Sequence, residues 1–120
     1  MKLLGNVPHA AVEHLLRAAD VFVSASLAEG SGYALLEALA CGAFPVVTDI
    51  PAFRAITGNG RMGKLWPRAD AAALADALIG AAEHRVDRAA VRAHFDSTLS
   101  FDALGARWAN TYAQLLAGAP

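Results

Sequence analysis

The chain has little of what marks a disulfide-stabilised, zinc-binding or membrane-spanning protein. Its 120 residues include one cysteine, Cys41, which excludes an intramolecular disulfide and a zinc site built from several cysteines. No apolar run reaches the roughly 18 residues of a spanning helix, and the apolar run at the start is too short for a signal peptide. We therefore expect no membrane span and a cytoplasmic location.

Excess charge of either sign is also missing. Ten Lys and Arg residues face eleven Asp and Glu residues, for a formal net charge of −1. This balance gives no electrostatic reason to expect nucleic acid or an anionic membrane as a partner. What the chain has instead is a hydrophobic content of 56% with only 18% charged residues, which suits one domain, or a piece of one, that buries much of itself.

The apolar residues are arranged as short strands that alternate with helices. Buried strands are expected at Val21–Val23 and Pro45–Thr48, and shorter ones at Lys2–Leu4 and Gly63–Trp66. Helices are expected between them at 8–19, 32–41 and 49–57, the last with Asp49 as its cap. The alternation predicts an α/β fold with a partial Rossmann-like parallel sheet of three to four strands. A doubly wound unit usually has five or six strands, so we expect the chain to begin in the middle of a larger sheet.

The C-terminal end is predicted to be rich in helices. Asp70 can cap a helix that turns Leu74, Leu78 and Ala81 inward, and a shorter helix is expected over about 87–95. Arg85, Arg88 and Arg92 are interpreted as a solvated helix face, with a surface for a partner as the less favoured alternative. A last helix over about 101–116 carries an apolar stripe, for which core packing is the expected role. The residues of this stripe are Phe101, Leu104, Trp108, Tyr112 and Leu115.

Nine residues carry the strongest functional signal, from Glu29 to Glu37. Glycines after a strand let the backbone approach a ligand closely, and a helix that begins there adds the positive end of its dipole. Gly30-Ser31-Gly32 therefore indicates an anion site, at the carboxyl end of Val21–Val23, where open α/β sheets bind ligands. Glu37 is either a solvent-facing glutamate or a carboxylate that accepts hydrogen bonds from vicinal hydroxyls in a cleft. Glu29, taken alone as a carboxylate in a loop, does not indicate a function.

The stretch EGSGYALLEALACGAFPVV, which begins at Glu29, resembles the donor-binding motif of family 4 retaining glycosyltransferases of the GT-B type, which have two Rossmann domains. The flanks agree, with Ala19–Val23 before the motif and Asp49–Arg54 after it. The tail agrees as well, at Gly63, Leu65, Pro67, Asp70, Leu74, Trp108 and Tyr112. Three features depart from the family pattern and suggest a subfamily: Ser31 in place of an aromatic residue, an extra residue at Ala43-Phe44, and Ala55 at a position that is often acidic.

The resemblance implies a retaining transfer of a hexosyl or mannosyl group from a nucleotide-activated sugar. Glu29 would contact hydroxyls of the donor sugar and steady charge near its anomeric carbon, and Glu37 would bind the hydroxyls of the ribose. The diphosphate would lie against the helix start formed by Gly30, Ser31, Gly32, Tyr33 and Ala34. Neither a cofactor nor a metal ion is expected, since the helix end and basic side chains would provide the electrostatic stabilisation.

The resemblance also implies what the chain lacks. The basic pair of the family that grips the pyrophosphate normally precedes Lys2, as does the acceptor-binding domain. Residues 1–120 are thus expected to be a single partial domain, the donor-binding half of such an enzyme, inactive without its N-terminal half or a partner chain. The parent protein would be cytoplasmic or peripheral at the inner face of the membrane.

A second hypothesis comes from a different class of function. An incomplete sheet exposes an edge and an apolar face, so the chain could be a non-catalytic α/β module that binds a protein partner or forms a homodimer through that edge.

Two other sequence patterns are weak evidence of function. Gly58–Gly63 matches G-x-G-x-x-G, but a helix is expected before it and a strand after it, the reverse of the dinucleotide-binding order. The histidines do not have the spacing of metal ligands.

Overall fold

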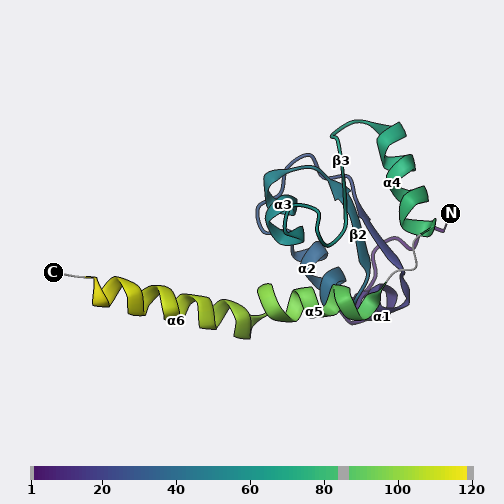
Figure 1. Cartoon of the computed structure of the whole chain (residues 1–120). Helices are drawn as coiled ribbons and strands as arrows, with labels where there is room; N and C mark the ends of the chain where they lie inside the picture. Colours follow the sequence, from purple (N-terminus) through teal and green to yellow (C-terminus); the bar gives the residue numbers. More distant parts are fainter. Residues whose placement is uncertain (1, 84–86, 119–120) are drawn as a thin grey trace.

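A parallel sheet of three strands organises the computed structural model, which describes residues 2–83 and 87–118 (Figure 1). The strands are β1 (Val21–Ser24), β2 (Phe44–Thr48) and β3 (Lys64–Trp66), in the spatial order β1-β2-β3. This confirms the predicted α/β class and the partial Rossmann-like sheet. The strand expected at Lys2–Leu4 is wrong: the segment is irregular, with Leu3 and Leu4 exposed, and among the described residues no strand lies beside it to complete its hydrogen bonds.

Six helices connect and flank these strands within the described part of the chain. They match the expected positions to within about three residues, the uncertainty usual for helix ends. The helices are α1 (His9–Ala18), α2 (Tyr33–Ala40), α3 (Pro51–Thr57), α4 (Ala71–Glu83), α5 (Arg88–Thr98) and α6 (Phe101–Ala117). None of them is long and apolar enough to cross a bilayer, as far as residues 2–83 and 87–118 are concerned.

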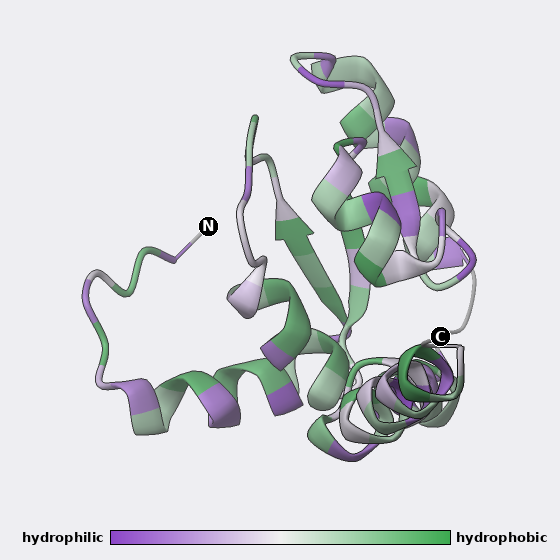
Figure 2. Ribbon diagram, turned by 90° about the vertical axis from the view of Figure 1, so that its left-hand side faces the viewer, coloured by the Kyte–Doolittle hydropathy of each residue, from purple (hydrophilic) through white to green (hydrophobic). Residues whose placement is uncertain are grey.

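Helices cover both faces of the sheet, and strand β2 contributes to the core on each side. Side chains alternate along a strand, so Val46 and Val47 point to opposite faces. Val46 packs with Trp66 and Ala81 under α4, with Leu74 and Leu78 beside them, as predicted. Val47 packs on the other face, in the larger cluster. That cluster contains Leu35, Leu39, Ile50, Phe53, Ile56 and Val91, from α2, α3 and their neighbours. Figure 1 shows the strands between α3 on one side and α4 on the other, and in Figure 2 the strands are coloured mostly as hydrophobic.

Helix α6 projects away from this body, beyond the end of α5 (Figure 1). The molecule therefore measures 60 × 31 × 28 Å along its principal axes. The prediction that the apolar stripe of α6 packs into the core is wrong, since Phe101 is 95% exposed and Trp108 64% exposed. The helix itself was predicted correctly; the described chain does not supply a surface against which most of its stripe could pack.

The solvated position expected for Arg88 is also wrong, because its guanidinium is hydrogen-bonded to backbone carbonyl groups. Its guanidinium donates to the carbonyl oxygens of Ala19 at 2.6 Å, Arg17 at 2.7 Å and Cys41 at 3.0 Å. Carbonyl groups at a helix C-terminus lack hydrogen-bond donors within the helix. The guanidinium of Arg88 provides these donors at the ends of both α1 and α2. Arg92 similarly donates to the carbonyl of Ala40 at 2.7 Å. Arg85 lies outside the described residues.

The two aspartates expected as caps behave differently. Asp70 caps α4 as predicted, since its Oδ1 accepts a hydrogen bond from the backbone N–H of Ala73 at 2.9 Å. Asp49 does not cap α3, whose N-cap is Ile50. Its two carboxylate oxygens instead accept hydrogen bonds from the guanidinium of Arg54. That hydrogen-bonded guanidinium lowers the pKa of the Asp49 carboxyl below its usual range.

Candidate functional site

The loop between β1 and α2 lies at the carboxyl edge of the sheet, and Gly32 ends it as the N-cap of α2. Gly32 has the left-handed conformation, with φ of 64°, which glycine adopts without strain. A Cβ at this position would lie 2.7 Å from Cδ1 of Ile56 in α3. The left-handed conformation and this close approach to α3 both favour a glycine where the backbone enters α2.

Helix α2 begins at Tyr33, directly after this turn. The N–H of Leu36 bonds to the carbonyl of Gly32 at 3.0 Å, which closes the first turn. The amides of Tyr33, Ala34 and Leu35 have no partner within the helix, since the first N–H groups of any α-helix point out of its end. Ser31 and Tyr33 beside this end are exposed, so an anion has access to it.

Glu29 is held at this edge by a short series of hydroxyl groups. Ser24 Oγ, at the end of β1, donates to Ser26 Oγ at 3.2 Å, and Ser26 Oγ donates to Glu29 Oε1 at 3.1 Å. The buried Thr48 donates its hydroxyl to the carbonyl of Ser24 at 3.1 Å, which links the ends of β1 and β2. The carboxylate remains exposed, with its other oxygen outside this pair of bonds. Glu29 is thus positioned by the sheet but open to a ligand.

Glu37 lies one turn into α2 and is partly covered. Its side chain is 43% exposed, and Oε1 lies 3.8 Å from Nε2 of His9 at the start of α1. Because Glu37 is the fifth residue of α2, it stands about 8 Å along the helix from its N-terminus at 1.5 Å per residue. The side chain is neither buried nor fully exposed, so its exposure leaves open both interpretations drawn from the sequence, a solvent-facing glutamate and a carboxylate in a cleft.

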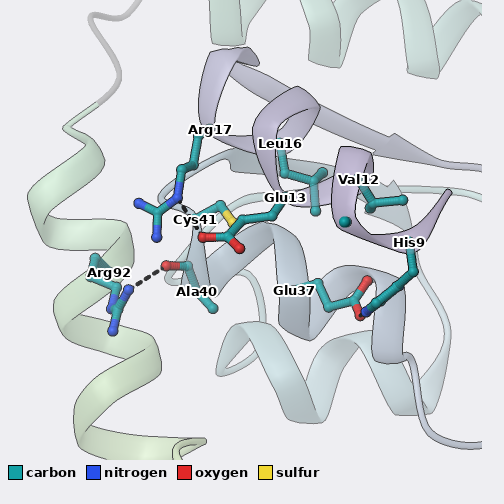
Figure 3. A pocket seen from close by; sticks show the side chains of 10 residues that line it. His9, Val12, Glu13, Leu16, Arg17, Glu37, Ala40, Cys41 and Arg92 are labelled. Carbon is teal, nitrogen blue, oxygen red and sulfur yellow. Dashed lines mark hydrogen bonds and ion pairs between the residues drawn. The ribbon is translucent and has the colours of Figure 1, made fainter. Parts of the chain in front are cut away.

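Two cavities meet at Glu37. The first has a volume of 290 Å³ and lies between α1, α2 and α5 (Figure 3). In Figure 3 the Glu37 carboxylate points toward His9 across this space, while Glu13 and Arg17 lie further along α1. The second cavity, of 370 Å³, is mostly apolar and lies between α2, α5 and α6. Its lining includes Ser31, Tyr33 and Glu37 together with Phe95, Leu99, Phe101 and Leu104.

The structure thus groups some of the predicted site residues and separates another. Ser31, Tyr33 and Glu37 share one cavity, whereas neither cavity has Glu29 in its lining. Sequence reasoning missed the hydroxyls of Ser24, Ser26 and Thr48, and also His9. The sequence could have indicated the two serines, since they occupy the end of the predicted strand and the loop toward Glu29. It could not have indicated His9, because that residue is distant in sequence from the motif.

Metal binding was not expected from the resemblance. Within residues 2–83 and 87–118, the structure forms no cluster of three or more His, Cys, Asp or Glu side chains that could hold a metal ion. That the transfer reaction needs neither a metal ion nor a cofactor remains a prediction.

Residues 1–84 match the family model described as "Glycosyl transferases group 1". The curated relatives include the phosphatidyl-myo-inositol mannosyltransferases of three mycobacterial species. Identity is 40% over 80 residues for Mycobacterium leprae, 39% over 84 residues for Mycolicibacterium smegmatis and 38% over 93 residues for Mycobacterium tuberculosis. These alignments cover 66%, 69% and 73% of this chain, but only 21%, 22% and 25% of the relatives. The chain therefore spans about a quarter or less of the length of these proteins.

The similarity to solved structures extends over nearly the whole chain. The sucrose-phosphate synthase of Thermosynechococcus elongatus superposes on it with a TM-score of 0.75 and 26% sequence identity. The superposition covers 98% of this chain and 31% of the synthase. The similarity in structure thus continues past residue 84, where the family match ends. The described architecture is that of a Rossmann-like GT-B fold.

Proposed function

Because this chain belongs to the glycosyl transferases group 1 family, we propose that it binds the nucleotide-activated sugar donor for a retaining glycosyl transfer. The observation that carries the proposal is the open N-terminus of α2 at the carboxyl edge of the sheet. Glu29 stands before it and Glu37 one turn into the helix. This order of an acid, an anion site and a second acid fits the order of sugar, diphosphate and ribose in a nucleotide sugar.

Each part of the donor has a partner of matching chemistry. The diphosphate lies at the first amides of α2, from Ser31 to Ala34, where the helix dipole favours negative charge. The ribose diol donates two hydrogen bonds to Glu37, whose two oxygens are both acceptors. Glu29 accepts from hydroxyls of the sugar, and its negative charge stabilises the positive charge that develops at the anomeric carbon.

The rest of the reaction then depends on residues outside this sequence. Acceptor binding and the basic pair that neutralises the leaving diphosphate come from another part of a longer protein or from a partner chain. The 120 residues alone are then a donor-binding half with little or no transferase activity.

Isothermal titration calorimetry with UDP-, GDP- and ADP-glucose and GDP-mannose tests donor binding directly. We expect at least one of them to bind, in competition with the corresponding nucleoside diphosphate. Absence of heat and of competition for every donor at millimolar concentration contradicts the proposal.

The exposed stripe on α6 favours a second candidate function, self-association. Its apolar residues recur every three or four positions, the spacing at which two helices pack along a common seam. The charged residues of α6 are Asp102 and Arg107, of opposite sign, so two copies of this helix do not repel each other strongly. We propose a second copy of this chain as the partner of α6, in place of the sheet edge suggested by the sequence.

Trp108→Glu is the variant that tests this second candidate. Trp108 lies in the middle of the stripe and is 64% exposed, so a carboxylate there leaves the fold intact. The same carboxylate disfavours the packing of two α6 helices along their apolar stripes. We expect light scattering to show a dimer whose dissociation constant rises about tenfold in Trp108→Glu. Asn110→Glu, on the opposite side of α6, is the matched control and stays dimeric. A wild-type chain that is monomeric at every concentration contradicts self-association.

A further inference from the structure

His9 and Glu37 face each other across the cavity between α1 and α2, and nothing else in the described contacts of Glu37 carries a positive charge. Nε2 of His9 lies 3.8 Å from Oε1 of Glu37, and the His9 side chain is 86% exposed (Figure 3). An imidazole at this distance reaches the carboxylate with a small rotation of its side chain. Histidine is the side chain that ordinarily changes charge between pH 5 and 8.

We propose that His9 is a positioning residue that makes donor binding by Glu37 dependent on pH; this rests on the donor-binding function proposed above. Neutral His9 leaves both Glu37 oxygens to the diol of the ligand. Protonated His9 donates to Glu37 and draws the carboxylate toward α1, so that the diol must compete for it. Affinity for the nucleotide sugar is therefore lower when His9 is protonated, that is, toward acid pH.

The other charged groups around this cavity are already paired. Glu13, four residues after His9 on α1, accepts a hydrogen bond from Arg17 at 2.8 Å, and this bond lowers the pKa of the Glu13 carboxyl. Arg92, on α5, is bonded to Asp96 at 2.9 Å and to the carbonyl of Ala40 at 2.7 Å. Cys41 completes the titratable groups in the lining. Glu37 is therefore the carboxylate left for a protonated His9.

The test is the pH profile of donor affinity, measured by calorimetry between about pH 5.5 and pH 8. The probe is whichever of the four nucleotide sugars above binds most tightly. Its diphosphate is a diester without a proton to gain in this range, unlike a free nucleoside diphosphate. Because an exposed ion pair contributes little, we expect wild-type affinity to fall only about two- to fivefold at the acid end.

Two variants separate this role from a structural one. His9→Gln keeps a polar side chain at an exposed helix start and is expected to bind with an affinity that no longer changes with pH. His14→Gln changes another exposed histidine of α1 and is expected to keep the wild-type profile. A pH dependence that persists in His9→Gln, or a flat wild-type profile, overturns the role of His9 while donor binding stands. Failure of the wild type to bind any donor at any pH overturns both proposals.

Discussion

Replacing Glu37 by glutamine is expected to weaken donor binding by about 10- to 100-fold. A hydrogen bond to a charged group contributes about 1.5–3 kcal/mol, and 1.4 kcal/mol corresponds to a factor of ten. Glutamine keeps the size of the side chain but replaces one acceptor oxygen by a donor, so it cannot accept from both hydroxyls of a diol. Calorimetric titration of the wild type and Glu37→Gln with the same nucleotide sugar measures this loss.

Glu83→Gln is the matched control for this substitution. Glu83 is an exposed glutamate at the end of α4, on the opposite side of the sheet from α2. We expect it to bind the donor as the wild type does. Equal affinity of wild type and Glu37→Gln, with both folded by circular dichroism, removes Glu37 from the proposed site.

Gly63→Ala is expected to produce the largest loss of stability. Gly63 has φ of 133°, and a Cβ there would lie 2.6 Å from Cγ and 2.7 Å from the carbonyl oxygen of Pro45 in β2. A backbone conformation of this kind costs about 1–3 kcal/mol in a residue other than glycine, and overpacking adds about 1–3 kcal/mol. We expect a loss of about 2–6 kcal/mol, a large part of the stability of a small domain. Thermal unfolding should show a Tm lower by roughly 10 °C or more.

Gly105→Ala provides the comparison for that measurement. Gly105 lies inside α6, and a Cβ there would meet no heavy atom within 4 Å. Alanine has a higher helix propensity than glycine, so this variant should keep or slightly raise the Tm. A similar Tm for Gly63→Ala and the wild type contradicts the close approach of Gly63 to β2.

Sequence reasoning succeeded where local pattern and local packing agree. The strands at β1 and β2 follow from short β-branched runs, and the Asp70 cap from its position before an apolar helix. Gly32 was expected near the start of α2, and its left-handed turn is what a glycine at that position permits. The resemblance of the motif to glycosyltransferases is confirmed by the family match and by the relatives.

Failures occurred where the structure depends on contacts between distant residues. A stripe such as that of α6 predicts an apolar face but not which surface covers it, and in this structure most of it stays exposed. Arg88 bonds to carbonyls 47 to 71 residues earlier in the chain, which no local pattern reveals. The pairing of His9 with Glu37 likewise arises because α1 packs beside α2. The solvated position expected for Arg88 was wrong for this reason.

The most direct test of donor binding is a titration of the isotopically labelled chain with a nucleotide sugar, followed by amide chemical shifts. We expect saturable shifts centred on Gly30 to Ala34, with a second group around Glu37, and little change in α4 on the opposite side of the sheet. Shifts of this pattern place the donor at the N-terminus of α2. Saturable binding whose shifts leave Gly30 to Ala34 unchanged, or no shifts at millimolar donor, contradicts donor binding at this end of α2.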